Sequence, residues 1–255
     1  MKLKGCVVAL IFLQTWLTPV FAAACHAESG QYVIPLLELY TSEGCSSCPP
    51  ADRWLSSLQS RQGEVNALAF HVDYWDGLGW KDRFAQEAFS DKQRTQASQT
   101  GSNVVYTPQF TLNGYDFRGW SDSRLDRLLQ KINMQPAQLT LALQQLNEDN
   151  GQIAFRTTVT TPQQHLPVQL WLAVYQHGLH TQVKAGENNG RVLNHDFVVL
   201  QHMGPYSLDQ LNILRHLVPD QSLLAHANGV VLYARHALNG EVLQSLQLPV
   251  CRPGH

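Results

Sequence analysis

Two cysteines separated by two residues mark the segment of this chain best suited to chemistry. The segment Cys45-Ser46-Ser47-Cys48-Pro49-Pro50 follows an apolar run and precedes a stretch with helical spacing. The first turn of a helix leaves backbone N–H groups unpaired and carries a partial positive charge, which favours a thiolate over a thiol. Because the thiolate is the nucleophilic form of cysteine, the pattern predicts a dithiol redox centre at the start of a helix.

The two thiols are expected to have different tasks. Cys45 precedes the helix, so we expect it to be exposed and to act as the nucleophile. Cys48 lies about one turn further in and would resolve a mixed disulfide. Such an exchange needs no organic cofactor, and it can run in either direction.

A lone CxxC pair can also be a structural disulfide or half of a zinc site. A structural zinc site usually has four ligands, and no second CxxC, CxxH or HxxxH follows in the sequence. A disulfide across this gap closes a very short loop and restricts the unfolded chain little. Copper(I) is a poorer fit, because only Met134 and Met203 remain after the N-terminal segment. Redox chemistry is therefore favoured, and we expect neither a metal nor a cofactor.

The N-terminus predicts export. Lys2 and Lys4 precede an apolar run over 5–17 and then small residues, as in a cleaved secretory signal. The run is too short for a spanning helix of about 20 residues, so no transmembrane span is expected after processing. We expect the signal to cover residues 1–27, with cleavage after Ala24 or Ala27; lipidation at Cys25 is a minor alternative. A periplasmic or secreted location follows, where disulfides persist.

The charge balance and the hydrophobic pattern limit the partners and the domain organisation that the rest of the chain can have. Without Lys2 and Lys4, 16 basic residues face 20 acidic ones, which argues against a nucleic-acid partner. A compositional change near residue 134 predicts one domain over 28–134 and a β-rich domain over 135–255. In the first we expect a strand over 33–40, the helix after the cysteines, a strand over 65–73, a helix over 82–99, a hairpin of 109–112 and 115–118 around Asn113-Gly114, and a helix over 121–129. Strands over 153–159, 168–175, 197–200 and 229–234 predict a small β-sandwich in the second.

The order of these elements, with a dithiol opening the first helix, resembles the thioredoxin fold. The resemblance implies that Pro108, directly before the hairpin, is a cis proline facing the dithiol, with the backbone beside it, at Thr107, pairing with a substrate chain. An ordinary trans proline is the alternative, since only about 5% of X-Pro bonds are cis.

The chain also resembles a family of exported bacterial thioredoxin-like proteins catalogued as a domain of unknown function. The matching blocks are 38–52, 71–76, 106–109 and 186–191, followed by His195-Asp196. Membership implies the fold and export, but no established reaction. The expected fold class is therefore α/β, a thioredoxin-like domain followed by a small, mostly antiparallel β-sandwich.

Three further residues are candidates for the dithiol site. Glu38 lies in the middle of an apolar strand, where a charge is costly to bury. A neutral Glu38 with a raised pKa could pass protons to and from Cys48, as a buried acid does in thioredoxin; a salt bridge or an exposed strand edge is the equal alternative. Asp73 shares a strand face with His71 and is a weak candidate beside the dithiol. Trp75 belongs to an aromatic set that could form a rim for partner binding, with core packing as the alternative.

Two features of the second half stay open at this point. Glu187, Arg191, His195 and Asp196 are expected to hold the loop around Asn188-Asn189-Gly190 rather than to form a second active site; if that loop leans toward Cys45, it could select the partner. Cys251 could bond to a retained Cys25 or remain free.

Two functions follow from different classes. The first is an exported thiol-disulfide oxidoreductase that acts on protein thiols or disulfides and is recycled by a redox partner. The alternative is a non-catalytic envelope binding protein in which Cys45–Cys48 is a structural disulfide.

Overall fold

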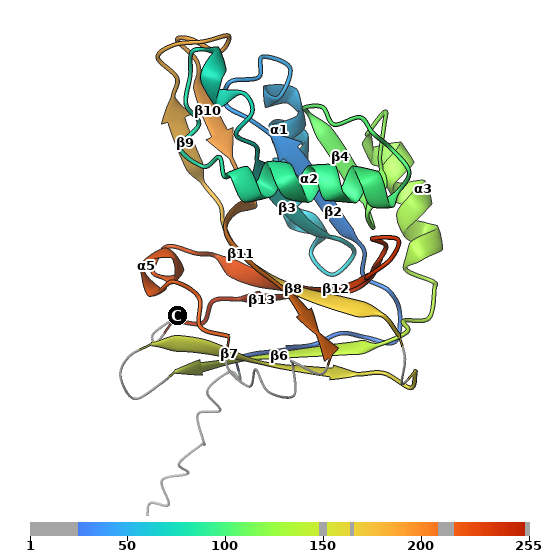
Figure 1. Ribbon diagram of the computed structural model, residues 1–255. Helices are drawn as coiled ribbons and strands as arrows, with labels where there is room; N and C mark the ends of the chain where they lie inside the picture. Colours follow the sequence, from blue (N-terminus) through green and yellow to red (C-terminus); the bar gives the residue numbers. More distant parts are fainter. Residues whose placement is uncertain (1–24, 148–151, 164–165, 209–216, 253–255) are drawn as a thin grey trace, which may run out of the picture.

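The main sheet of this protein runs through both halves of the chain (Figure 1). The structure is a computed structural model that describes residues 25–147, 152–163, 166–208 and 217–252. Eight strands form a mixed sheet in the order β13-β12-β8-β11-β3-β2-β4-β5. Their bounds are β2 (Leu36–Thr41), β3 (Asn66–His71), β4 (Gln109–Leu112), β5 (Tyr115–Asp116), β8 (Val168–Gln176), β11 (Val198–Ser207), β12 (Gly229–His236) and β13 (Val242–Pro249).

Three helices lie against the β3-β2-β4 part of the sheet (Figure 1). They are α1 (Pro49–Ser57), α2 (Glu87–Gln99) and α3 (Asp122–Ile132), with short 3-10 turns η1 (Leu58–Arg61) and η2 (Asp76–Leu78). Proline fits the first turn of a helix because its missing N–H would be unpaired there, and α1 begins with two prolines. Ser121 caps α3 by accepting the N–H of Arg124, as the sequence predicts.

The hairpin between β4 and β5 forms as the Asn113-Gly114 pair predicts. Asn113 and Gly114 have φ values of 51° and 92°, and left-handed residues of this kind suit the tight turn of a hairpin. A Cβ at position 114 would lie 2.4 Å from the carbonyl oxygen of Gly240, so only glycine fits where the second half of the chain approaches the turn.

A second core lies between the far part of the main sheet and a three-stranded sheet. That sheet has the order β1-β6-β7, formed by β1 (His26–Glu28), β6 (Thr140–Asn147) and β7 (Ile153–Thr160). Leu141, Leu143 and Phe155 pack there against Leu172 and Leu246 of the main sheet. A short helix, α5 (Gln221–Leu224), closes one end, and a disulfide between Cys25 and Cys251 joins the two ends of the described chain.

The expected fold class is wrong. We predicted an α/β thioredoxin-like domain followed by a separate small sandwich, but the structure is mostly β, and the strands of both halves build one sheet. β11 pairs in parallel with β3 at Val198 and Ala69, and β8, β12 and β13 continue from it. Side-chain alternation reveals a strand and its buried face, whereas any free strand edge can pair with another, so the pattern does not identify neighbours.

The sequence also predicts a domain boundary and a cleaved signal. The boundary near residue 134 stays a prediction. Residues 1–24 of the predicted signal lie outside the described residues. In the described part of the chain, no helix is long and apolar enough to cross a membrane.

Candidate dithiol site

The two cysteines form a disulfide at the start of α1. Cys45 and Cys48 are bonded with their Cα atoms 5.4 Å apart, and Cys48 is the residue that caps the helix. The carbonyl of Cys48 accepts the N–H groups of Ala51 and Asp52, so the pair is fixed to the first helical turn. The two cysteines thus lie at the start of a helix, as predicted. At this position the helix N-terminus stabilises a thiolate once the disulfide is reduced.

Both cysteines are buried in the disulfide state. Each is 0% exposed, while Ser46 and Ser47 between them are exposed. The sulfur of Cys45 lies 3.3 Å from the Ser47 hydroxyl oxygen. The expectation that Cys45 is exposed is therefore wrong for this state, because its neighbouring side chains cover it.

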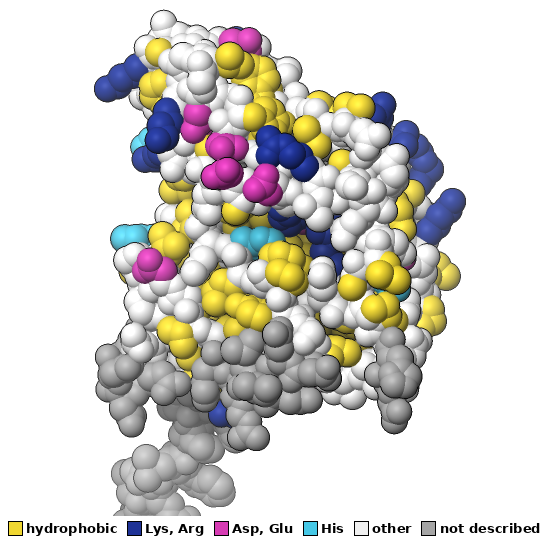
Figure 2. All heavy atoms as spheres, in the orientation of Figure 1, with side chains coloured by type: hydrophobic (Ala, Val, Ile, Leu, Met, Phe, Trp, Pro, Cys, Tyr) yellow, Lys and Arg dark blue, Asp and Glu magenta, His cyan; other side chains and the backbone are white. Residues whose placement is uncertain are grey.

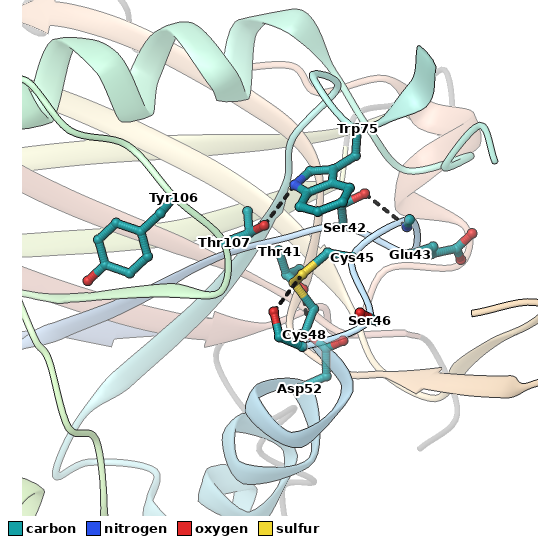
Figure 3. The surroundings of a disulfide bond; sticks show 12 residues. Thr41, Ser42, Glu43, Cys45, Ser46, Cys48, Asp52, Trp75, Tyr106 and Thr107 are labelled. Atoms are coloured by element: carbon teal, nitrogen blue, oxygen red, sulfur yellow. Dashed lines mark hydrogen bonds between the residues drawn. A yellow bond between two sulfur atoms is a disulfide. The ribbon is translucent and has the colours of Figure 1, made fainter. Parts of the chain in front are cut away.

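Trp75 and Thr107 lie beside the disulfide (Figure 3), and Pro108 directly follows Thr107. The indole Nε1 of Trp75 donates to the Thr107 hydroxyl at 2.8 Å, and Figure 3 shows both side chains over the cysteine turn. The Thr107–Pro108 peptide bond is cis, as the resemblance implied. A mostly apolar groove of about 410 Å³ extends from Pro108 along Tyr106, Phe117 and Trp120.

A loop from the second half of the chain covers the cysteine turn from another side. It connects β9 (Leu179–Gln182) and β10 (Val192–His195), which form a two-stranded ribbon. The buried amide of Asn188 donates to the carbonyl oxygens of Glu43 and Cys45, both at 2.9 Å. The Glu187 carboxylate accepts the N–H of Ser46 at 3.0 Å. The loop thus leans toward Cys45, which was the condition for a role in selecting a partner.

A buried cluster of charges lies under the same turn. The imidazole of His195 is 3.5 Å from a carboxylate oxygen of Glu43 through Nε2, and 3.5 Å from one of Asp52 through Nδ1. Asp52 also accepts the Thr41 hydroxyl at 3.0 Å. Burial opposes a charge on His195, but the carboxylates of Asp52 and Glu43 outweigh it and raise the pKa of His195 to about 9. His195 is therefore a buried cation at neutral pH.

A second histidine pair adjoins this cluster. Nδ1 of His71 lies 2.6 Å from Asp82 Oδ2, and the rings of His71 and His195 are 4.9 Å apart. Asp82 also accepts the N–H of Glu43, and the other oxygen of Glu43 accepts the Trp80 indole N–H at 2.8 Å. Burial by itself raises the pKa of Asp82, but the interaction with His71 outweighs burial, so the pKa of Asp82 lies below its usual value. Ionisable side chains from β3, α1, β10 and two loops therefore form one buried cluster.

The charge on His195 predicts a pH dependence of stability. A group whose pKa rises from 6.5 in the unfolded chain to about 9 on folding stabilises the protein fully below pH 6.5 and loses that effect as the pH rises toward 9. Between pH 6.5 and 8 the loss is about 1.5 kcal/mol. Urea unfolding across this range measures it. The His195→Gln variant should show no such slope, and an equal slope in the variant would assign it to another group.

Glu38 is present in the core, but not as a neutral acid. Its carboxylate contacts the ammonium group of Lys92 and accepts hydrogen bonds from Gln96 and Thr111. Burial by itself raises the pKa of Glu38, but Lys92 and Arg235 outweigh it and lower the pKa to about 2. Of the two predicted alternatives, the structure has the salt bridge, so a proton relay from a neutral Glu38 has no support.

Asp73 is held by α2. Its carboxylate accepts the hydroxyl of Ser90, and its N–H donates to the same hydroxyl at 3.1 Å. Of the other aromatic residues, Trp120 lines the groove beside Pro108, and Trp75 and Tyr74 are partly buried against the core.

Sequence reasoning missed part of the cluster. Glu43 and Asp52 stand in the block that carries the cysteines, yet surface exposure is the usual expectation for carboxylates. The sequence gives no sign that Asp82 belongs to the site, and it predicts only that His195 helps to hold its own loop. One usable signal existed: Glu43 and Asp52 closely flank a helix start that must be packed, so at least one of them required a buried partner.

Comparisons with known proteins give a family and a fold. A family model described as "Protein of unknown function (DUF1223)" matches residues 36–234. The crystal structure of protein AGR_C_4864 from Agrobacterium tumefaciens is similar at a TM-score of 0.60 and 22% identity, covering 89% of this chain and 100% of that one. HBP35 of Porphyromonas gingivalis is similar at a TM-score of 0.60 and 13% identity, covering 88% of this chain and 81% of that one. These identities show a shared fold alone. Among curated proteins there is no match.

Proposed function

Because this chain belongs to the DUF1223 family, whose function is unknown, we propose from its residues that it is an exported thiol-disulfide oxidoreductase that acts through Cys45 and Cys48. The observation that carries the proposal is the contrast between its two disulfides. Cys25–Cys251 spans 226 residues and can restrict the unfolded chain strongly. Cys45–Cys48 spans 3 residues at a helix N-terminus, where it restricts little and favours a thiolate.

The exchange takes two steps that balance. A thiolate of the partner attacks the sulfur of Cys45, the Cys45–Cys48 bond breaks, and Cys48 leaves as a thiolate that takes up a proton. A second partner thiolate then attacks the partner sulfur bonded to Cys45 and releases Cys45. The partner loses two electrons and gains a disulfide, and the protein gains the two electrons as a dithiol. Reduction of a partner disulfide is the same sequence reversed.

The surface beside the disulfide supports a polypeptide substrate. The groove is mostly apolar and is lined by Pro108, which directly follows Thr107, the residue that accepts the Trp75 indole N–H. An incoming thiol must open the surroundings of Cys45 to reach its buried sulfur, which the Ser47 hydroxyl contacts. We propose protein thiols or disulfides as substrates, and a separate redox protein that recycles the dithiol.

Export rests on the predicted signal and on the two disulfides. Disulfides persist in oxidising compartments and are rare in the cytosol. The proposed location is therefore the periplasm or the medium.

One observation favours a second function. Both sulfurs of the Cys45–Cys48 bond are buried, as in a structural disulfide. In that case the protein is a non-catalytic envelope binding protein.

A redox titration distinguishes the two functions. The mature protein is equilibrated in graded glutathione buffers, free thiols are trapped, and the Cys45–Cys48 bond is followed by peptide mass. We expect a midpoint between about −120 and −270 mV, the range of exchanging catalysts. A midpoint below about −300 mV is typical of a structural bond and would establish the alternative. Cys25–Cys251 is the internal control and should stay oxidised throughout.

A further inference from the structure

The charge cluster under the cysteine turn takes no part in the exchange steps above. Glu43 is two residues before Cys45, and Asp52 is four residues after Cys48. His195 joins the two carboxylates at 3.5 Å each, and all three residues are at most 6% exposed. Figure 3 shows Asp52 directly below Cys48 and Glu43 on the loop that leads into Cys45. The imidazole therefore contacts one residue on each side of the cysteine pair.

The polar groups around His195 come from several elements packed against it. Glu43 approaches from the loop after β2 and Asp52 from α1, while His71 lies at the end of β3 with its ring against His195 and its Nδ1 on Asp82. The neighbouring strand β9 contributes the uncharged Thr181, whose side chain helps to lower the pKa of Glu43. Three carboxylates thus share a buried region behind the dithiol. Like charges disfavour a thiolate, so a cation at His195 is needed to offset them.

Resting on the proposed function, we propose that His195 is a positioning residue: a buried cation, held by Glu43 and Asp52, that sets the stability of the Cys45 thiolate and with it the reduction potential of the Cys45–Cys48 pair. His195 forms no bond to the partner. It acts on the reduced state, where a negative sulfur replaces a neutral disulfide. Helix N-termini next to a cation lower cysteine pKa values to about 3.5–7.5, so Cys45 should be largely ionised at pH 7.5.

The test replaces His195 with glutamine, which keeps polar atoms but carries no charge. In chemically reduced protein, the pH dependence of alkylation gives the pKa of Cys45. We expect the pKa to rise by at least about one unit, so that the midpoint of the alkylation curve moves to a correspondingly higher pH. In the glutathione titration at pH 7.5, two glutathione thiols give two electrons and two protons to the disulfide and leave as glutathione disulfide. That equilibrium should shift about tenfold toward the protein disulfide, which is about 30 mV more negative.

Two further variants separate charge from structure. His177→Gln removes an imidazole that also lies 3.5 Å from a carboxylate, that of Asp196. Asp196 interacts with Ser56, two helical turns along α1 from Cys48, so this variant should leave the pKa and the potential of the dithiol unchanged. His195→Lys restores a positive charge with a different shape, and it should return both values toward the wild type.

The outcomes are distinct from those that decide the proposed function. An unchanged Cys45 pKa in His195→Gln, or an equal change in His177→Gln, overturns the role of His195. A wild-type potential below about −300 mV overturns the oxidoreductase instead. The alkylation measurement still decides on His195 in that case, because it uses reduced protein and no exchange partner.

Discussion

Under the proposed function, the Cys48→Ser variant should hold its partners as covalent mixed disulfides on Cys45. In this variant the Cys45 thiolate attacks a partner disulfide and releases one partner thiolate, but no Cys48 thiol remains to displace the partner from Cys45. Turnover should fall by on the order of 10³ or more, as when one member of a catalytic unit is removed. The complexes should persist on non-reducing gels and vanish on reduction. Peptide mass of the gel bands should identify Cys45 as the point of attachment.

The matched control is Cys45→Ser, which keeps Cys48 at the cap of α1 and removes the nucleophile. It should trap no partner and lose turnover to the same extent. A folded Cys48→Ser protein that captures nothing, with only a modest loss of stability, would favour the binding-protein function.

The Lys92→Met variant is expected to be the most damaging single change in the core. Its ammonium group contacts Glu38 and donates to Tyr40 at 2.8 Å and to Gln96 at 3.3 Å, in a region sealed from solvent. Removing one partner of a buried ion pair leaves an uncompensated charge and costs roughly 3–5 kcal/mol. Urea unfolding at pH 7 measures this loss.

The pair itself adds little net stability. Burial lowers the pKa of Lys92 to about 8 in spite of Glu38, whereas Lys92 helps to lower the pKa of Glu38 to about 2. The free energy needed to bury the charged lysine therefore offsets the free energy gained from its attraction to Glu38. The double variant Glu38→Gln/Lys92→Met should therefore recover much of the stability lost in Lys92→Met. A double variant as unstable as the sum of its singles would show that the two side chains act independently.

The local structure around the cysteines could be predicted from the sequence because its determinants are local. Two prolines fix the start of α1, Asn113-Gly114 fixes the hairpin, and Ser121 fixes the cap of α3. Each depends on backbone angles or hydrogen bonds within a few residues.

The sheet and the charge cluster could not be predicted, because both depend on contacts between distant segments. β11 meets β3 across more than a hundred residues, and His195 reaches Asp52 over a similar separation. The alternation of side chains in a strand does not identify the strand that pairs with it. A carboxylate that is expected at the surface can be buried when it pairs with a cation from a distant segment, and the sequence does not show that pairing. Glu38 shows the same limit: the sequence places it in an apolar strand, but it does not identify the partner on α2.

The bond between Cys25 and Cys251 turns the described chain into a covalent ring. A single cut by a protease at any point between these residues leaves both fragments attached, and only a second cut or a reductant releases one. The same bond decides what else Cys25 can carry, because a sulfur joined to Cys251 has no valence left for a lipid. The disulfide and a lipid on Cys25 therefore exclude each other.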